Sequence, residues 1–198
     1  MSTPIRLQYL ELKQRYPDTL LFFRLGDFYE TFDDDAKTVA DELQITLTSK
    51  PMGKDLRVPL AGVPYHSIDA HVAKLVGRGH RVAICEQMAD PAEVKGIVPR
   101  DVVRVVTAGT VTADASLDAA APNYLAALAV RGNDTALALA DITTGEVRLA
   151  AGPEAALELV RSAPSELLVE DLADAAGEAA TVLRPQMSET AAGAELAR

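Results

Sequence analysis

The feature that most constrains the fold is an apolar run, Leu20 to Phe23, which is followed by the dipeptide Gly26-Asp27. Its continuous apolar character predicts a strand covered on both faces, and Gly-Asp is typical of a turn that ends a strand. All four phenylalanines of the chain lie in this neighbourhood, and there is no tryptophan: Phe22, Phe23, Phe28 and Phe32. The pattern therefore predicts a core strand with an aromatic side chain, Phe28, at its edge.

Phe28 has two interpretations. By residue type alone it is an aromatic at the start of a helix and packs inward, since phenylalanine is usually a core residue. Alternatively, Phe28 and the acid two positions later, Glu30, suit a minor-groove wedge whose ring enters between base steps while the carboxylate reaches a base edge. Unstacking costs least at a mispaired base, so such a wedge would distinguish mispaired from intact duplex without reading the sequence.

A set of motifs in the first half of the chain resembles the MutS family of DNA mismatch repair proteins. The central motif, Gly26-Asp27-Phe28-Tyr29-Glu30, is similar to the family's Gly-Asp-Phe-Tyr-Glu signature. Further matching segments follow the family's order: Thr3-Pro4 with Gln8-Tyr9, Asp34-Asp35-Ala36, Pro59 to His66, Val82 to Gln87, and Val102-Val103-Arg104 through Gly109-Thr110. The family's usual proline before that Gly-Thr pair is Ala108 here. The resemblance is dense over the first half and loose over the second.

The resemblance implies an α/β (α+β) fold in two parts. We expect a mixed-sheet mismatch-recognition domain with packed helices over residues 1–109, and an incomplete ribonuclease-H-like connector domain over 123–198. Residues 110–122 are rich in Ala, Asp and Thr without periodicity, which is typical of a linker. The family implies Phe28 as the wedge, Glu30 as the base-edge partner, and a DNA-facing segment that includes Leu60 and Gly62.

Apolar spacing predicts the elements of the first part. Helices are expected over 4–16, from Asp33 to Gln44 and from Ser67 to Val76, with a buried strand over 81–85 and a further strand over 102–107. Residues 45–48 alternate like a strand, 49–57 are polar and contain Pro and Gly, and 58–65 contain two prolines. We therefore expect a short strand followed by two loops, because proline is disfavoured in a central strand.

Several cations are candidates for phosphate contacts. Lys50, Lys54 and Arg57 fall in the predicted polar loop, and Arg100 precedes the last predicted strand of the first part. A cationic loop near the wedge would position the protein on the DNA backbone without reading sequence. The ordinary alternative is a solvated loop, and for Arg100 a salt bridge within the protein.

No metal site or catalytic centre is predicted. The three adjacent acids Asp33, Asp34 and Asp35 precede a helix, where they favour its dipole, and consecutive side chains on a helix diverge. The histidines and the single cysteine, Cys85, match no common zinc spacing, and we expect Cys85 to be a small core residue. No phosphate-binding Gly-x-x-x-x-Gly-Lys-Ser/Thr loop is present.

The second part changes pattern at Asn123. Three strands are expected over 124–130, 135–142 and 146–151, then a helix over 154–161 and a strand over 167–169. These resemble the start of the family's connector domain. Asp141 resembles a catalytic acid of the ribonuclease-H-like fold class, but the resemblance implies a connector that is not a nuclease, and one acid cannot build a two-metal site. Residues 173–198 are alanine-rich and weakly patterned.

The charge is unevenly distributed. Residues 1–115 contain 14 Lys/Arg and 16 Asp/Glu, a net charge of −2, whereas residues 116–198 contain 5 and 13, a net charge of −8. The first part therefore lacks the positive charge that drives nonspecific DNA affinity, and we expect this chain alone to bind DNA weakly. The apolar runs are too short for a membrane span, and a single cysteine fits a reducing cytoplasm. A bacterial, cytoplasmic, nucleoid-associated location is expected.

The leading hypothesis is recognition of mispaired or unpaired bases at the start of mismatch repair, with mismatched duplex DNA as the partner. The second hypothesis is an acidic protein-interaction module that docks a downstream mismatch-repair protein. A metal-dependent nuclease ranks third. The resemblance implies no enzyme activity and no cofactor for this chain, since ATP and Mg²⁺ belong to the family's ATPase domain, and it implies that the full-length protein is a homodimer.

Overall fold

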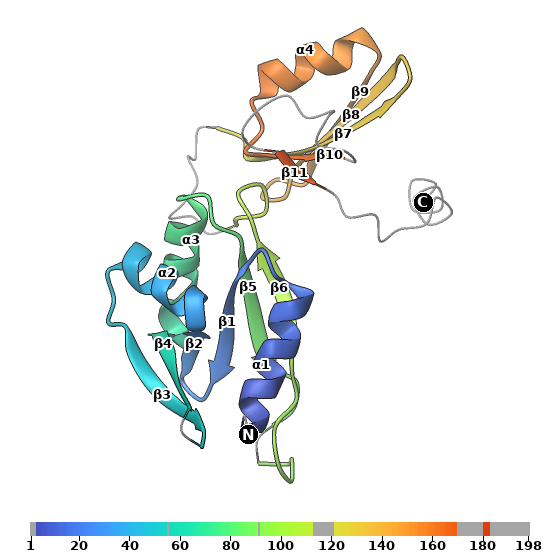
Figure 1. Ribbon diagram of the computed structural model, residues 1–198. Helices are drawn as coiled ribbons and strands as arrows, with labels where there is room; N and C mark the ends of the chain where they lie inside the picture. Colours follow the sequence, from blue (N-terminus) through green and yellow to red (C-terminus); the bar gives the residue numbers. More distant parts are fainter. Residues whose placement is uncertain (1–2, 55, 91, 113–120, 170–179, 183–198) are drawn as a thin grey trace. The chain divides into compact units, whose positions relative to one another are not determined.

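The computed structural model describes residues 3–54, 56–90, 92–112, 121–169 and 180–182. Its contacts divide the chain into two compact units, Met1–Leu117 and Asp118–Arg198. The described part contains both helices and strands, with one mixed sheet in each unit (Figure 1). This is the α/β (α+β) class expected from the sequence. Most of the predicted linker, residues 113–120, lies outside the described residues.

The first unit is built on a six-stranded sheet with the order β3-β4-β2-β1-β5-β6. Its elements are α1 (Pro4–Arg15), β1 (Leu20–Leu25), β2 (Phe28–Phe32), α2 (Asp33–Leu43), β3 (Thr48–Gly53), β4 (Leu56–Pro64), the 3₁₀ turn η1 (Tyr65–Ser67), α3 (Ile68–Val76), β5 (Val82–Gln87) and β6 (Arg100–Val106). β1 and β5 are parallel, and the other neighbouring pairs are antiparallel. The three predicted helices and the strands at β1, β5 and β6 are confirmed.

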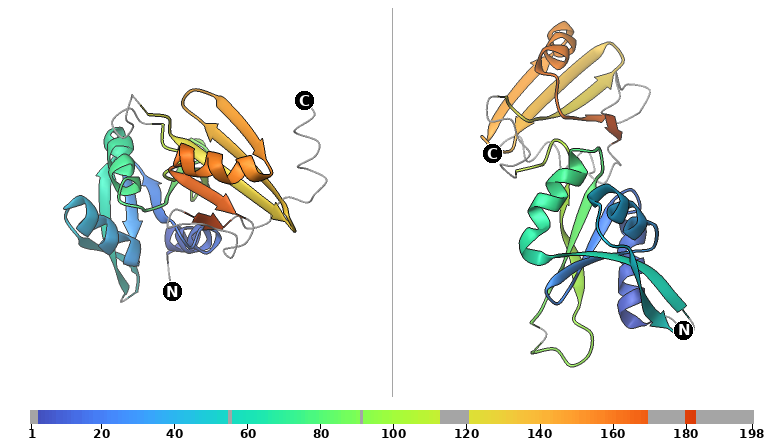
Figure 2. Two further views of the ribbon diagram at one scale, coloured as in Figure 1. Left: turned by 90° about the horizontal axis from the view of Figure 1, so that it is seen from above. Right: turned by 90° about the vertical axis from the view of Figure 1, so that its left-hand side faces the viewer.

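Helices cover both faces of this sheet, α1 on one face and α2 with α3 on the other (Figures 1 and 2). The α1 face packs Tyr9 and Leu12 against a set of strand residues: Leu21, Phe23, Phe32, Met52, Val58, Ala83 and Cys85. Phe22 and Tyr29 point to the opposite face and pack with α2 and α3. The predicted double coverage of β1 is confirmed, since Leu20 through Phe23 are all buried.

Each of the three adjacent acids at the start of α2 binds different partners. Asp33 pairs with Arg6, and Asp34 lies 2.8 Å from Lys37. Asp35 is buried, and its carboxylate accepts hydrogen bonds from the Leu21 amide and from two side chains of α1, the Tyr9 hydroxyl and the Lys13 ammonium, at 2.9–3.2 Å. Asp35 therefore joins α1, β1 and α2. Burial and the neighbouring Asp35 carboxylate raise the pKa of Tyr9.

Three predictions for residues 45–65 are wrong. The expected polar loop at 49–57 is a β-hairpin, because β3 runs to Gly53 and β4 begins at Leu56. The expected loop at 58–65 is mostly β4, which lies between β3 and β2. Proline has backbone angles compatible with a strand and removes only one donor. Here Pro59 lies opposite Ser49 of β3, and the next residue, Leu60, pairs with both β3 and β2. Residues 45–47, expected as a strand, have no regular structure.

The second unit has a five-stranded sheet with the order β11-β10-β7-β8-β9. Its elements are β7 (Tyr124–Arg131), β8 (Asp134–Asp141), β9 (Glu146–Ala151), α4 (Pro153–Ser162), β10 (Glu166–Val169) and β11 (Ala180–Val182). The β7–β9 meander is antiparallel, and β10 pairs in parallel with both β7 and β11. The predicted meander, helix and fourth strand are confirmed. The weakly patterned end, apart from β11, lies outside the described residues.

Candidate nucleic-acid interface

The β1–β2 hairpin determines where Phe28 lies. Its turn is the dipeptide Gly26-Asp27, in which Gly26 has a φ of +58°. A positive φ at the first central position alone is the pattern of a type II′ turn, which fits the twist of antiparallel strands. The strand β2 begins at once with Phe28, opposite Leu25 on β1 and Pro64 on β4.

The interpretation of Phe28 as an inward-packed aromatic at a helix start is wrong. Phe28 is 46% exposed at the beginning of a strand, whereas Phe22, Phe23 and Phe32 are fully buried. Alternation along β2 explains the difference: Tyr29 and Thr31 face α2 and α3, and Phe28, Glu30 and Phe32 face the α1 side. Of the three β2 residues on the α1 side, Phe32 at the far end of the strand is the one whose ring packs against Tyr9 of α1.

Glu30 lies beside Phe28 on the same face and is only partly exposed. Gly62 stands opposite it on β4, and a Cβ on Gly62 would lie 3.5 Å from the Glu30 Cγ. Leu60 follows on the same side of β4, half-buried. The structure therefore brings four of the predicted site residues together on one sheet face: Phe28, Glu30, Leu60 and Gly62.

The four candidate cations have different environments. Lys50 on β3 lies on the same face and its ammonium pairs with the Glu30 carboxylate, with Nζ 3.0 Å from Oε2. Lys54 is exposed between β3 and β4. Arg57 binds the hydroxyl and the carbonyl of Ser49 across the hairpin. Arg100 is partly buried, where it donates to the carbonyls of Arg24 and Val98 at 2.8 Å, and burial lowers its pKa.

Two residues that sequence reasoning missed support the hairpin turn. The Arg24 guanidinium lies 5.2 Å from the Tyr29 ring centroid and 4.3 Å from that of Tyr65. The Tyr65 amide donates to the Asp27 carbonyl at 2.9 Å. The buried Tyr29 hydroxyl donates to Glu86, and burial raises its pKa to about 12. No local motif marks these contacts, because Tyr65 is far from Arg24 in the sequence.

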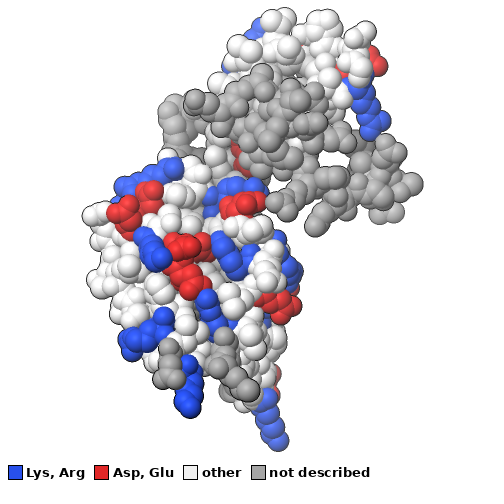
Figure 3. Space-filling model, in the orientation of Figure 1, with Lys and Arg blue, Asp and Glu red and all other residues white. Residues whose placement is uncertain are grey.

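Charges on the first unit are mixed rather than uniformly basic. Figure 3 shows Lys/Arg and Asp/Glu side chains interspersed on the face that it displays. Ion pairs with described carboxylates engage seven cations of residues 1–115: Arg6, Lys13, Arg15, Lys37, Lys50, Arg78 and Arg104. Seven of the 14 Lys and Arg side chains in residues 1–115 are thus paired, which reduces the positive charge available for a broad phosphate footprint.

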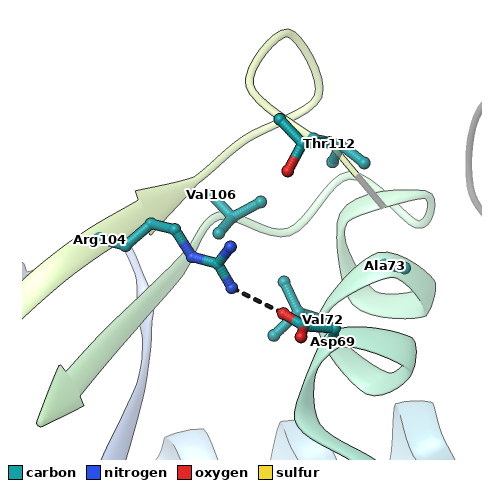
Figure 4. A pocket seen from close by; sticks show the side chains of 7 residues that line it. Asp69, Val72, Ala73, Arg104, Val106 and Thr112 are labelled. Atoms are coloured by element: carbon teal, nitrogen blue, oxygen red, sulfur yellow. Dashed lines mark hydrogen bonds and ion pairs between the residues drawn. The ribbon is translucent and has the colours of Figure 1, made fainter. Parts of the chain in front are cut away.

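A separate pocket of about 300 Å³ lies between α3, β6 and the segment after β6 (Figure 4). Val72, Val106 and Val111, which belong to the core on the α2 and α3 side, form its apolar lining. Asp69 and Arg104 lie along it and form an ion pair at 2.8 Å. It is therefore distinct from the face that carries Phe28 and Glu30.

Metal and membrane sites receive no support from the described residues. They contain no group of three or more His, Cys, Asp or Glu that could hold a metal ion. Asp141 ends β8 and accepts hydrogen bonds from the hydroxyl and amide of Thr143, which hold its pKa below the usual value. Its carboxylate thus stabilises the β8–β9 turn. None of the described helices is both long and apolar enough to span a bilayer.

The chain is similar to a known family model and to several curated proteins. The family model described as MutS domain I matches residues 3–115. A protein named DNA mismatch repair protein MutS from Acetivibrio thermocellus is 54% identical over 144 residues, which cover 73% of this chain and 17% of that protein. The protein of the same name from Dehalococcoides mccartyi is 53% identical over 144 residues, with the same two coverages.

A third relative of that name, from Sorangium cellulosum, is 46% identical over 194 residues, 91% of this chain and 21% of the relative. The chain thus spans only about a fifth of the length of these curated relatives. The matched model is domain I, and the similarity extends beyond it into the second unit. With a family model that covers more than half of the chain and relatives at about 50% identity, this chain belongs to the MutS family of DNA mismatch repair proteins.

Proposed function

We propose that this chain recognises mispaired or unpaired bases in duplex DNA at the start of mismatch repair. The proposal rests on family membership and on one observation of the structure, the exposure of Phe28. Three phenylalanines are buried completely, and the fourth presents its ring to solvent beside a carboxylate. The Phe28 ring is apolar and lies directly after the β1–β2 turn, which Arg24 and Tyr65 support. Such a ring suits insertion between base steps.

In this proposal Phe28 is the wedge and Glu30 is the contact to the unstacked base edge. A carboxylate accepts a hydrogen bond from a base N–H, and phosphates repel it. Intact duplex offers no unstacked base edge, so the contact forms only where stacking is already weak. Leu60 and Gly62 shape the surface next to the wedge, and the exposed Lys54 and Arg57 contact phosphates, which fixes position without selectivity.

The test is Phe28→Ala in a protein extended to the length of the curated relatives, with binding measured on one heteroduplex and its matched homoduplex. Base–aromatic stacking is worth about 1 to 3 kcal/mol, so we expect about a tenfold or greater loss of heteroduplex affinity. Homoduplex affinity should change little. Leu47→Ala is the matched control, since Leu47 is 48% exposed in the same unit. Unchanged discrimination in Phe28→Ala would remove the wedge assignment.

Glu30→Ala in the same protein tests the second contact. We expect tighter homoduplex binding, because the variant lacks the carboxylate that repels phosphates, and a smaller ratio of heteroduplex to homoduplex affinity. Weaker homoduplex binding with an unchanged ratio would instead make Glu30 a structural residue.

The further partners belong to the rest of the protein and to the second unit. We propose that the extended protein dimerises and binds ATP and Mg²⁺ outside this chain. The second unit is the candidate docking surface for a downstream repair protein, because α4 and β9 expose four apolar side chains by 65% to 81%: Val147, Leu149, Leu157 and Val160. Leu149 and Leu157 line the same pocket together with Ala150, and exposed apolar side chains that lie together are typical of an interaction surface.

A further inference from the structure

The Glu30 carboxylate already has a partner in the DNA-free protein. The Lys50 ammonium lies 3.0 Å from Oε2 and 3.3 Å from Oε1, so it binds both oxygens. The Glu30 side chain is 16% exposed and that of Lys50 is 44% exposed. A contact that Glu30 makes to a base edge therefore has to replace or share this ion pair.

The pair spans three strands, which makes it a property of the sheet and not of one hairpin. Glu30 is on β2 opposite Gly62, and Lys50 is on β3 opposite Val58, so the lysine reaches diagonally across β4. Gly62 leaves the path open, since a Cβ there would lie within 3.5 Å of the Glu30 side chain and 3.3 Å of the Tyr29 carbonyl. The arrangement holds the two charges on the face that presents Phe28.

We propose that Lys50 is a specificity-determining partner of Glu30 which competes with DNA for its carboxylate. On matched duplex the ion pair stays closed and cancels a negative charge that phosphates would repel. At a mispaired base, the N–H of the unstacked base displaces the ammonium from Glu30. Glu30 therefore binds a base edge only where the hydrogen bond to the base is more favourable than the ion pair with Lys50. This inference rests on the proposed function of Glu30.

Whether removing Lys50 raises or lowers the ratio of heteroduplex to homoduplex affinity depends on which of the two complexes requires the Glu30–Lys50 ion pair to open. Removing the Lys50 charge weakens binding to both duplexes, because one cation near phosphates is lost in each case. Only the heteroduplex complex also has the ion pair to break, and this cost disappears with the lysine. The ratio of heteroduplex to homoduplex affinity should therefore rise, by about two- to fivefold, as expected for a partly exposed pair.

The experiment measures Kd for one heteroduplex and its matched homoduplex in the extended protein. Lys50→Met and the matched control Lys54→Met are each made in the wild-type and the Glu30→Gln backgrounds. Lys54 is exposed in the same hairpin and forms no ion pair with a described residue. We expect Lys50→Met to raise the ratio only when residue 30 is Glu, and Lys54→Met to lower both affinities equally in both backgrounds. Lys50→Arg keeps the charge and should keep the wild-type ratio.

The outcomes separate this inference from the function on which it rests. If Glu30→Gln lowers the ratio but Lys50→Met lowers both affinities equally in either background, Lys50 is an ordinary phosphate contact and only the inference fails. A fall in the ratio in Lys50→Met also overturns it. If Glu30→Ala leaves the ratio unchanged, the proposed base contact fails and the inference with it. Circular dichroism and thermal melts establish that each variant is folded.

Discussion

At the scale of single residues, the environment of a side chain matters more than its type. Phe28 and Phe32 are identical residues on one strand face, yet one is exposed and the other is packed under α1. Cys85 was expected to be a small core residue, and it is fully buried next to Phe23 on the α1 face. Burial raises the pKa of its thiol to about 12.

The thiol of Cys85 should therefore be unreactive in the folded chain. At pH 8 a thiol with a pKa near 12 is only about one part in ten thousand thiolate, and the thiolate is the reactive form. A disulfide reagent at pH 8 should label native protein at least about a hundredfold more slowly than urea-unfolded protein. Rapid labelling of the native chain, followed by mass spectrometry, would show that Cys85 is accessible.

At the scale of elements, one buried carboxylate and one glycine hold the parts of the first unit that position the site. Asp35 joins α1 to β1 and α2 by accepting three hydrogen bonds. Gly26 makes the turn that places Phe28 at the start of β2. Neither residue contacts DNA in the proposal. Substituting either one should therefore lower the free energy of unfolding of the first unit.

Asp35→Ala should destabilise the first unit by about 2 to 4 kcal/mol, because it removes the buried acceptor of the Leu21 amide and the carboxylate that pairs with Lys13. The Tyr9 hydroxyl and the Lys13 ammonium would keep only their bonds to the Phe32 and Thr19 carbonyls. Urea unfolding followed by circular dichroism measures this loss. Asp34→Ala is the control on the adjacent residue. The Asp34 side chain is 93% exposed and pairs with the Lys37 ammonium. A loss of similar size in both variants would contradict the role of Asp35.

Gly26→Ala should cost about 1 to 3 kcal/mol, since a φ of +58° strains a residue that has a Cβ. The neighbouring turn residue provides the comparison, because Asp27 has no positive φ and contributes its backbone carbonyl to Tyr65. Asp27→Ala should therefore stay within about 0.5 kcal/mol of wild type. Equal stability of the two variants in urea would mean that the turn relaxes without strain.

At the scale of the whole molecule, the two units have separate cores. The clusters of the first unit end at Val111, and that of the second begins at Tyr124. The first unit carries the proposed interface, and the second carries most of the net negative charge. Recognition and stability of the first unit should therefore be independent of the second core.

A chain ending at residue 117 should keep the fold of the first unit, with amide chemical shifts matching those of the full chain outside its last residues. Its unfolding midpoint in urea should be the same within error, because no core residue of the first unit is removed. Collapse of the dispersed spectrum on truncation would show that the first unit needs the second to fold.

Much of the fold and part of the site follow from local pattern. Apolar spacing located α1, α2 and α3, and the continuous run at Leu20 predicted a strand buried on both faces. The prediction failed at residues 45–65, where Pro59 and the polar composition indicated loops. There the pairing of β4 with two neighbours outweighs local preference, because strand propensity depends mainly on tertiary context.

The sequence by itself determined the family motif, the positions of most elements and the identity of Phe28 and Glu30 as candidates, since these depend on residues close together in the chain. Only the tertiary structure decided that Phe28 is exposed, that Arg24 and Tyr65 support its turn, and that Lys50 is bound to Glu30. These contacts form between residues that are distant in the sequence and become neighbours only in the folded sheet. Sequence spacing does not encode them, because side chains 20 or more residues apart meet only after the strands pair.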